Sequence, residues 1–151
     1  MARRKTWREK LQDDKDLPQV TTVEPGKWGP GGTCVIPAPR EVDALMRKVK
    51  PGKLTTINDL RTTLAKKHGT DMACPITTGI FAWIAAHAAE EGALAGEKDT
   101  TPWWRTLKTG GELNPKYPGG IEALAERLRD EGHEVFQKGK RWFVKPADKK
   151  S

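Results

Sequence analysis

The sequence has little that would support a secreted, membrane-spanning or metal-binding protein. Its two cysteines, Cys34 and Cys74, lie far apart and form no cluster with metal-ligand spacing. The opening residues, Met-Ala-Arg-Arg-Lys-Thr-Trp, are not followed by the apolar segment of a signal peptide. A P-loop and paired carboxylates are also missing. We therefore expect a cytoplasmic protein with no metal, no cofactor and no membrane, because few cysteines without a secretion signal fit a reducing compartment.

Charge is distributed unevenly along the chain, which carries a formal net charge of +7. Both ends are basic, as solvated tails often are. Residues 46–68 hold seven basic side chains and one acidic side chain, whereas residues 85–99 hold four acidic and one basic. A domain with opposite charges at its two ends would be oriented by the field of a polyanion.

The most apolar segment, residues 74–89, predicts the central helix of a small domain. Pro75 suits the first helical position, where a missing N–H costs nothing. The larger side chains recur at helical spacing: Ile76, Ile80, Trp83, Ile84 and His87. A helix that is apolar nearly all round is a buried one, so we expect this helix in the core, with its end near Gly92. The segment is too short and too interrupted to cross a bilayer.

The predicted fold is mixed α/β and mainly α, a winged helix-turn-helix domain with a C-terminal β-hairpin over residues 134–144. Further helices are expected over residues 40–49, 57–67 and 121–131. The domain spans residues 35–146, after an extended or partly disordered basic arm (1–34, with a helical turn around 7–11) and before a basic tail (147–151). Helix 57–67 and the central helix follow one another through a short turn with glycine. This order is typical of a helix-turn-helix and equally of an ordinary helical hairpin.

The order of several short segments resembles the DNA-binding domain of the alkylguanine-DNA alkyltransferase family, and in particular its non-catalytic alkyltransferase-like members. The resemblance covers residues 39–133 by element order. The segments are Pro51-Gly52-Lys53-Leu54-Thr55-Thr56, Ile57-Asn58-Asp59-Leu60, the helix with Gly79, Pro102-Trp103-Trp104-Arg105, Gly111-Glu112-Leu113, Tyr117-Pro118-Gly119-Gly120 and Glu131-Gly132.

The resemblance implies DNA binding without alkyl transfer. Trp103 and Trp104 stand where the alkyltransferases have the acceptor Cys and its His, and an indole is neither a thiolate nor a general base. The alkyltransferase-like proteins also lack that Cys and bind alkylated guanine. Ile57 replaces the family's base-rotating Tyr, and Ile76 replaces the Arg that fills the vacated stack. Glu131 matches the Glu of the lost relay, and we expect it to pair with Arg105 or to lie at the surface.

The predicted contacts fall into two sets. Residues expected at the DNA, partly because the start of the second helix faces the groove in this motif, are Lys53, Thr55, Thr56, Arg61, Thr77, Thr78 and Arg105. Residues expected around an extruded base are Trp103, Trp104, Tyr117, Gly119 and Gly120. Trp103 and Trp104 have an alternative role as core residues, and Tyr117 with the two glycines could form an ordinary turn.

The predicted function is therefore non-enzymatic binding of double-stranded DNA by a monomer, at alkylated or otherwise modified guanine, with no catalytic residue. The alternative is a protein-interaction or regulatory module that kept the fold without base flipping; a repair-protein partner is left unidentified. A third reading is an enzyme that uses Cys74, because a helix N-terminus lowers the pKa of a thiol and His68 or His87 could act as its base. The opposing reading is that Cys74 is a small buried hydrophobe.

Overall fold

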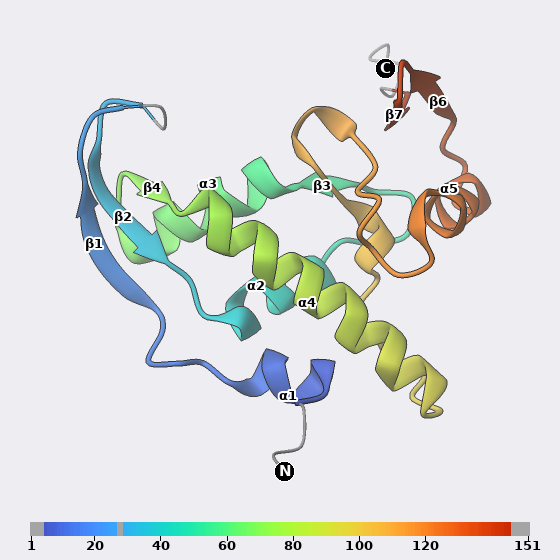
Figure 1. Cartoon of the computed structure of the whole chain (residues 1–151), viewed down its shortest axis with the longest axis horizontal. Helices are drawn as coiled ribbons and strands as arrows, with labels where there is room; N and C mark the ends of the chain where they lie inside the picture. Colours follow the sequence, from blue (N-terminus) through green and yellow to red (C-terminus); the bar gives the residue numbers. More distant parts are fainter. Residues whose placement is uncertain (1–4, 27–28, 146–151) are drawn as a thin grey trace.

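The computed structural model describes residues 5–26 and 29–145, and the predicted basic tail 147–151 lies outside them. In chain order the elements are α1 (Trp7–Gln12), β1 (Gln19–Val23), β2 (Gly32–Ile36), α2 (Pro39–Arg47), β3 (Thr55–Thr56), α3 (Ile57–His68), β4 (Met72–Ala73), α4 (Pro75–Leu94), η1 (Trp103–Arg105), β5 (Thr106–Leu107), η2 (Thr109–Gly111), α5 (Gly120–Asp130), β6 (Val135–Lys138) and β7 (Arg141–Val144). The fold is mixed α/β and mainly helical, as predicted (Figure 1). The winged helix-turn-helix interpretation stays a prediction. Within the described ranges, no helix is long and apolar enough to cross a membrane.

Helix α4 is the element on which most of the other helices pack (Figure 1). Cys74 precedes it in an extended conformation, and Pro75 occupies its first turn, where no N–H is needed. The buried side of α4 carries mostly small side chains: Thr78, Phe81, Ala82, Ala85, Ala86, Ala88, Ala89 and Gly92. α1, α2, α3 and η1 all contact it. The predicted central helix is therefore confirmed, although it continues two residues past Gly92.

Helices α2 and α3 form where the apolar periodicity predicts them. Thr56 caps α3, since its hydroxyl accepts the N–H of Asp59 at 3.2 Å and the Asp59 carboxylate accepts the N–H of Thr56 at 3.2 Å. A turn precedes this cap, with Gly52 at φ 80°, the left-handed conformation that such a turn requires after a proline. The apolar sides of both helices contribute to the core, through Val42 and Met46 of α2 and Leu60 and Leu64 of α3.

The helical turn expected around residues 7–11 is present as α1, whereas the expectation of an otherwise extended or partly disordered arm over residues 1–34 missed the hairpin that its described part forms. α1 packs on α4, and β1 pairs antiparallel with β2, which pairs in parallel with β4. Trp7 accounts for the docking of α1: its ring stacks on His87 at 4.5 Å between centroids and meets Trp83 edge-on at 4.8 Å. The sequence signal was weak because β1 is short and largely exposed, and Gly and Pro residues separate it from β2.

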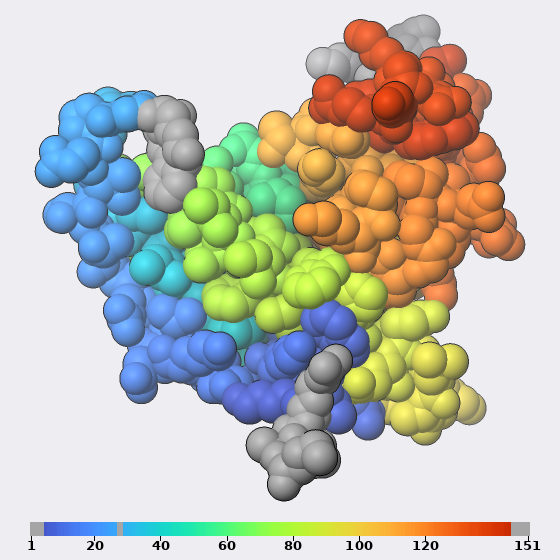
Figure 2. Space-filling model, in the orientation of Figure 1, coloured from blue at the N-terminus to red at the C-terminus, as the bar shows by residue number. Residues whose placement is uncertain are grey.

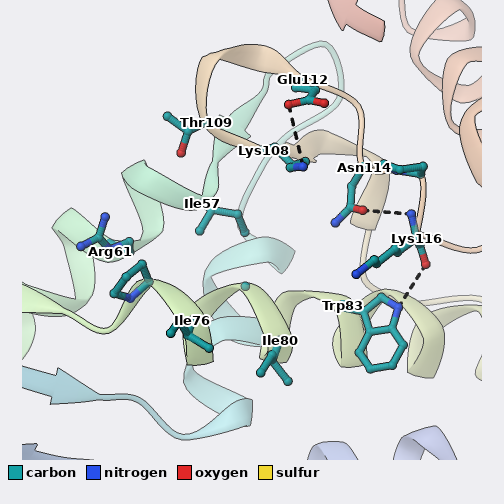
Figure 3. A pocket seen from close by; sticks show the side chains of 13 residues that line it. Ile57, Arg61, Ile76, Ile80, Trp83, Lys108, Thr109, Glu112, Asn114 and Lys116 are labelled. Carbon is teal, nitrogen blue, oxygen red and sulfur yellow. Dashed lines mark hydrogen bonds and ion pairs between the residues drawn. The ribbon is translucent and has the colours of Figure 1, made fainter. Parts of the chain in front are cut away.

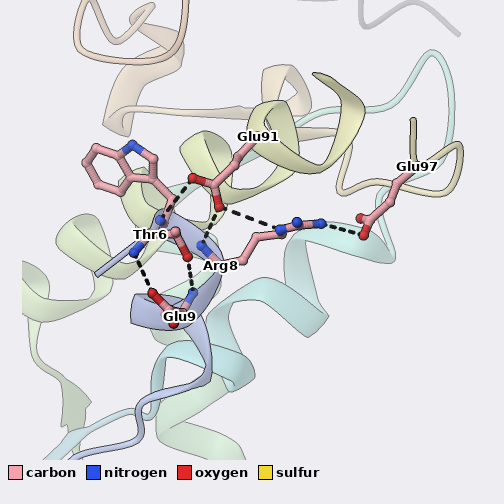
Figure 4. A network of polar contacts seen from close by, with 6 residues as sticks. Thr6, Arg8, Glu9, Glu91 and Glu97 are labelled. Atoms are coloured by element: carbon pink, nitrogen blue, oxygen red, sulfur yellow. Dashed lines mark hydrogen bonds and ion pairs between the residues drawn. The ribbon is translucent and has the colours of Figure 1, made fainter. Parts of the chain in front are cut away.

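The acidic end of α4 holds the N-terminus of α1 (Figure 4). The carboxylate of Glu91 accepts the backbone N–H groups of Trp7 at 3.3 Å and of Arg8 at 3.0 Å. These are groups that a helix N-terminus leaves without an intrahelical partner. The Arg8 guanidinium also reaches Glu97 at 2.6 Å. The carboxylates at the C-terminal end of α4 and in the loop after it therefore bind α1. Their negative charge is partly neutralised by these contacts and would repel a polyanion less.

The C-terminal part of the chain also follows the prediction. α5 buries Leu124, Ala125 and Leu128, and Gly132 follows it at φ 90°. β6 and β7 form the predicted hairpin, with Phe136 opposite Phe143. In the space-filling view this hairpin and the β1–β2 hairpin project from two corners of the molecule (Figure 2).

Candidate nucleic-acid interface

A cavity of about 680 Å³ opens between the first turns of α3 and α4 and the loop formed by residues 108–116 (Figure 3). This volume lies in the range of small-ligand sites. Its lining residues are Ile57, Arg61, Pro75, Ile76, Gly79, Ile80, Trp83, Lys108, Thr109, Glu112, Asn114, Pro115 and Lys116.

The floor of the cavity is apolar and belongs to α4. Ile76 and Ile80 are 56% and 44% exposed, so the expectation that this helix is buried all round is wrong on one side. The physical reason is that the alanine side of α4 allows close packing of its neighbours, whereas the larger isoleucines stay at the surface. Two exposed isoleucines one helical turn apart give the cavity a floor that can contact the flat face of a base.

The wall that faces α4 is fixed by one backbone carbonyl. The carbonyl of Lys116 accepts the indole N–H of Trp83 at 3.1 Å, and it lies 3.0 Å from Nε2 of His87. A carbonyl only accepts, so Nε2 of His87 carries a proton in this contact. Because His87 also stacks on Trp7, α1 supports the same wall from behind.

Cationic side chains stand around the opening. The Arg61 guanidinium is held in place, with Nε donating to the Ala73 carbonyl at 2.9 Å and a second nitrogen to the Asn58 side-chain oxygen at 3.3 Å. Within the described ranges neither Arg61 nor Lys116 has a carboxylate partner. Their charges are therefore available to a bound anion.

Glu112 is the one carboxylate among the lining residues, and it is already paired. Arg141 donates to it at 2.8 Å, and the ammonium of Lys108 lies 3.8 Å away. The hydrogen bond from Arg141 lowers the pKa of Glu112, while burial opposes the shift and the charge of Lys108 adds to it. Glu112 is therefore ionised at neutral pH and neutralised by its partners.

The residues predicted around an extruded base lie elsewhere. Trp103 and Tyr117 are 2% and 3% exposed, and their rings meet edge-to-face at 5.8 Å. The half-buried Trp104 contacts Trp103 edge-on at 5.7 Å and carries the Arg127 guanidinium over its ring at 4.4 Å. None of the three lines the cavity. Burial raises the pKa of the Tyr117 hydroxyl far above its ordinary value. The structure thus places Trp103 and Tyr117 in the core and Trp104 against it, which for the two tryptophans is the alternative that the sequence left open.

Gly119 and Gly120 also have a structural explanation and lie outside the cavity. Both have positive φ, at 79° and 72°, where they lead into α5. A Cβ at Gly119 would lie 2.5 Å from the Cβ of Ala123, so the close approach requires glycine.

Arg105, Thr78 and Thr56, three of the seven residues predicted to contact DNA, have side chains that form hydrogen bonds within the protein. Arg105 is buried and bonded to Glu131, which is one of the two outcomes expected for that glutamate. Thr78 is fully buried, and its hydroxyl donates to the Cys74 carbonyl at 2.7 Å. Thr56 caps α3. For Arg105 and Thr78 the prediction of a DNA contact is wrong, because neither side chain reaches the surface.

The other four predicted contacts differ in position. Lys53 is exposed in the turn before β3, and Arg61 lines the cavity. Thr55 is half-buried in β3, where it pairs with β5. The Thr77 hydroxyl is buried and has no hydrogen-bond partner in the described part of the chain. Lys53 and Arg61 are therefore the two whose side chains are placed at the surface or at the cavity, and their contact with DNA stays a prediction.

The two cysteines are buried and free. Burial raises the pKa of the Cys34 thiol, and its neighbour Cys74 adds to the shift. The proposed bases for Cys74 are engaged elsewhere, since His68 lies 2.6 Å from the Glu41 carboxylate and His87 contacts Lys116. The described residues contain no group of His, Cys, Asp and Glu suited to a metal ion.

Sequence reasoning did not assign the loop 108–116 to the site, although its lysines were visible. Ile57 and Ile76 were noted as helix residues and as departures from the family pattern but not as site residues, yet both line the cavity. The spacing of Ile76, Ile80 and Trp83 was a signal for one helix face. It did not show whether that face was buried or exposed.

No family model and no curated protein matches the chain. Among solved structures, the chain is similar to S. pombe Atl1 in its crystal structure in complex with damaged DNA containing O6-carboxymethylguanine. The similarity has a TM-score of 0.49 at 19% sequence identity and covers 71% of this chain and 87% of that chain.

Proposed function

We propose that this protein binds duplex DNA and holds an alkylated or otherwise modified guanine in the cavity without reacting with it. The observation that carries the proposal is the cavity itself, with its isoleucine floor at the start of α4 and with Arg61, Lys108 and Lys116 around it. Apolar surfaces hold an extruded base by its faces, and cations hold the phosphates of its strand. Both requirements meet at this one place.

The position of the cavity supports the same function. In a helix-turn-helix the first turn of the second helix meets the groove, and the cavity opens at the first turn of α4. Ile57 and Ile76 stand where the resembled family places its base-rotating Tyr and its stack-filling Arg. Both side chains line the cavity, so it occupies the place from which those residues would act.

The chemistry of the nearby groups supports binding over catalysis. Trp103 and Trp104 carry indoles, which supply neither a thiolate nor a general base. Cys74 is buried, and the two histidines that could have served it bond to other groups. An alkyl group bound here therefore meets isoleucine, tryptophan and lysine side chains, and it would leave unchanged.

A second candidate function is a protein-interaction module that kept the fold without base flipping. The exposure of Ile76 and Ile80 favours it, because contiguous apolar patches on a surface mark partner sites. The two candidates differ in their response to salt. Phosphate neutralisation is salt-dependent, whereas apolar contact with a protein is much less so.

The test is a binding titration on two matched duplexes, one with and one without an alkylated guanine, over a series of salt concentrations. We expect tighter binding to the modified duplex. With about three to five phosphate contacts, the log–log slope against salt should lie between about −2.7 and −4.5. An affinity that does not change between low and moderate salt would contradict DNA binding and favour the interaction module. The monomeric state and the cytoplasmic location stay predictions.

A further inference from the structure

We infer that the outer face of the β6–β7 hairpin is a second DNA-binding surface, which contacts the strand next to the nucleotide held in the cavity. This inference rests on the proposed function. The hairpin lies outside the part of the chain that resembles the alkyltransferase family, so the inference depends on this chain's own residues. We call its outer face, made of Phe136, Lys138, Arg141 and Phe143, the wing face.

The register of the hairpin divides its residues between two faces. Phe136 lies opposite Phe143, and Lys138 lies opposite Arg141. Directly opposed residues share a face, and residues two apart along a strand share it as well. The other face carries Val135, Val144 and Trp142, which are packed against the hydrophobic core. The wing face is therefore the side of the hairpin turned away from the core.

The hairpin is joined directly to the cavity wall. The N–H of Leu113 donates to the Trp142 carbonyl at 2.8 Å, and Glu112 forms a bridge with Phe143. The Glu112 carboxylate accepts from Arg141 at 2.8 Å and also lines the cavity. The wing face therefore begins where the cavity wall ends, and a strand that leaves the cavity on this side would meet it.

The charge of the hairpin suits a polyanion. Arg141 is paired with Glu112, and Lys145 is paired with Glu134 at 3.3 Å. Lys138 and Lys140, on either side of the turn at Gly139, are exposed and have no carboxylate partner among residues 5–26 and 29–145. Two unpaired ammonium groups at one turn are placed to neutralise phosphates of one strand.

An aromatic ring stands beside these lysines at the surface. Phe136 is 42% exposed, although it stacks on Phe143 with 5.6 Å between centroids and 22° between planes. The stacked pair holds the Phe136 ring in one orientation. Exposed aromatic rings beside cations are typical of nucleic-acid surfaces, where they contact bases and sugars. We therefore place a base or sugar of the flanking strand against Phe136 and its phosphates against Lys138 and Lys140.

The first test compares the double variant Lys138→Ala/Lys140→Ala with a control, Lys98→Ala. Lys98 is exposed in the acidic loop after α4, at the opposite end of that helix from the cavity. Salt titrations on the modified duplex should give the double variant a slope about 1.8 less steep and an affinity lower by on the order of tenfold or more at low salt. The control should match the wild type. The preference for modified over normal duplex should persist, because the cavity is untouched.

The second test is photo-cross-linking with the full-length chain. Phe136→benzoylphenylalanine should cross-link to the duplex, whereas Leu94→benzoylphenylalanine, at an 84% exposed position at the far end of α4, should not. A wild type that binds DNA, together with an unchanged slope in the double variant and no cross-link from position 136, would overturn the wing face and leave the proposed function standing. A wild type that fails to bind any duplex would overturn both.

Discussion

The guanidinium of Arg105 and the carboxylate of Glu131 form a two-point contact inside the protein. Nε of Arg105 donates to one carboxylate oxygen at 3.0 Å, and a terminal nitrogen donates to the other at 2.6 Å. The remaining terminal nitrogen donates to the Val49 carbonyl at 2.8 Å. This residue pair joins η1 to the end of α5 and to the segment after α2, so its role in this chain is structural.

Glu131→Gln should therefore lower the free energy of unfolding at neutral pH by about 3 kcal/mol, because it leaves the buried Arg105 charge without its partner. The hydrogen bonds from Arg105 lower the pKa of Glu131 below its ordinary value, although burial opposes the shift. With the folded-state pKa depressed, the stabilisation is fully present above the unfolded-state pKa, about 4.3. It is lost as the pH falls through the folded-state value.

Urea denaturation at pH 7 and near pH 3 measures this effect. The gap between wild type and Glu131→Gln should narrow at the lower pH as the wild-type carboxyl becomes protonated. Glu126→Gln, at an exposed position on the same helix, is the matched control and should change little at either pH. A gap of equal size at both pH values would contradict the ion-pair explanation.

Trp103→Ala should lower the free energy of unfolding by about 3–5 kcal/mol, as expected for a buried tryptophan. The ring is 2% exposed and contacts both Trp104 and Tyr117, so the substitution removes a large part of the core. Any loss of DNA binding should then follow the unfolded fraction measured by thermal melting. A folded variant that lost only its preference for modified DNA would instead place Trp103 in the base site.

Ile76→Ala and Ile80→Ala should affect recognition more than stability. Both side chains are well exposed, so each change should alter the free energy of unfolding by about 0.5 kcal/mol or less. We expect a smaller preference for the modified duplex with the same salt slope, because no phosphate contact is removed. Leu94→Ala, an exposed site on the same helix, is the control. Unchanged preference in both isoleucine variants would remove the cavity floor from the base site.

Incubation with alkylated DNA should leave the mass of the protein unchanged. Burial raises the pKa of the Cys34 thiol, and Cys74 is enclosed at the start of α4, so neither presents an exposed thiolate. Intact-mass spectrometry with peptide mapping checks this. A stoichiometric gain of one alkyl group on Cys74 would show that the protein is an acceptor.

The helices could be predicted because the capping residues at their ends and the apolar periodicity between them indicate the same boundaries. Thr56 and Asp59 supply a capping box where the apolar pattern of α3 begins, and Gly69 supplies the left-handed residue where it ends. The β1–β2 hairpin was not predicted, because its strands are short and one is almost entirely exposed. Its partner β4 is only two residues long.

The candidate site was harder to predict because hydrophobicity does not show which side of a helix is buried. From their hydrophobicity the isoleucines of α4 were expected in the core and its alanines on the remaining faces. In the structure the alanines are buried, and Ile76 and Ile80 are exposed. The tryptophans of η1 looked like a binding surface, yet they meet Tyr117 and Arg127 in a closed cluster. Whether such side chains are buried or line the cavity depends on how the loop 108–116 packs against α4. Contacts between segments that are distant in sequence cannot be predicted from local patterns.

The stack of Trp7 on His87 has a consequence for the order in which the molecule can be completed. During synthesis α1 is made before the surface that receives it, which belongs to α4, and before residue 116, whose carbonyl His87 contacts. Helix α1 therefore cannot pack in its final position, and Trp7 stays exposed, until α4 and the loop 108–116 have emerged. A nascent chain halted before this loop would leave that indole uncovered, so α1 would be fixed in place only after residues far downstream of it had been made.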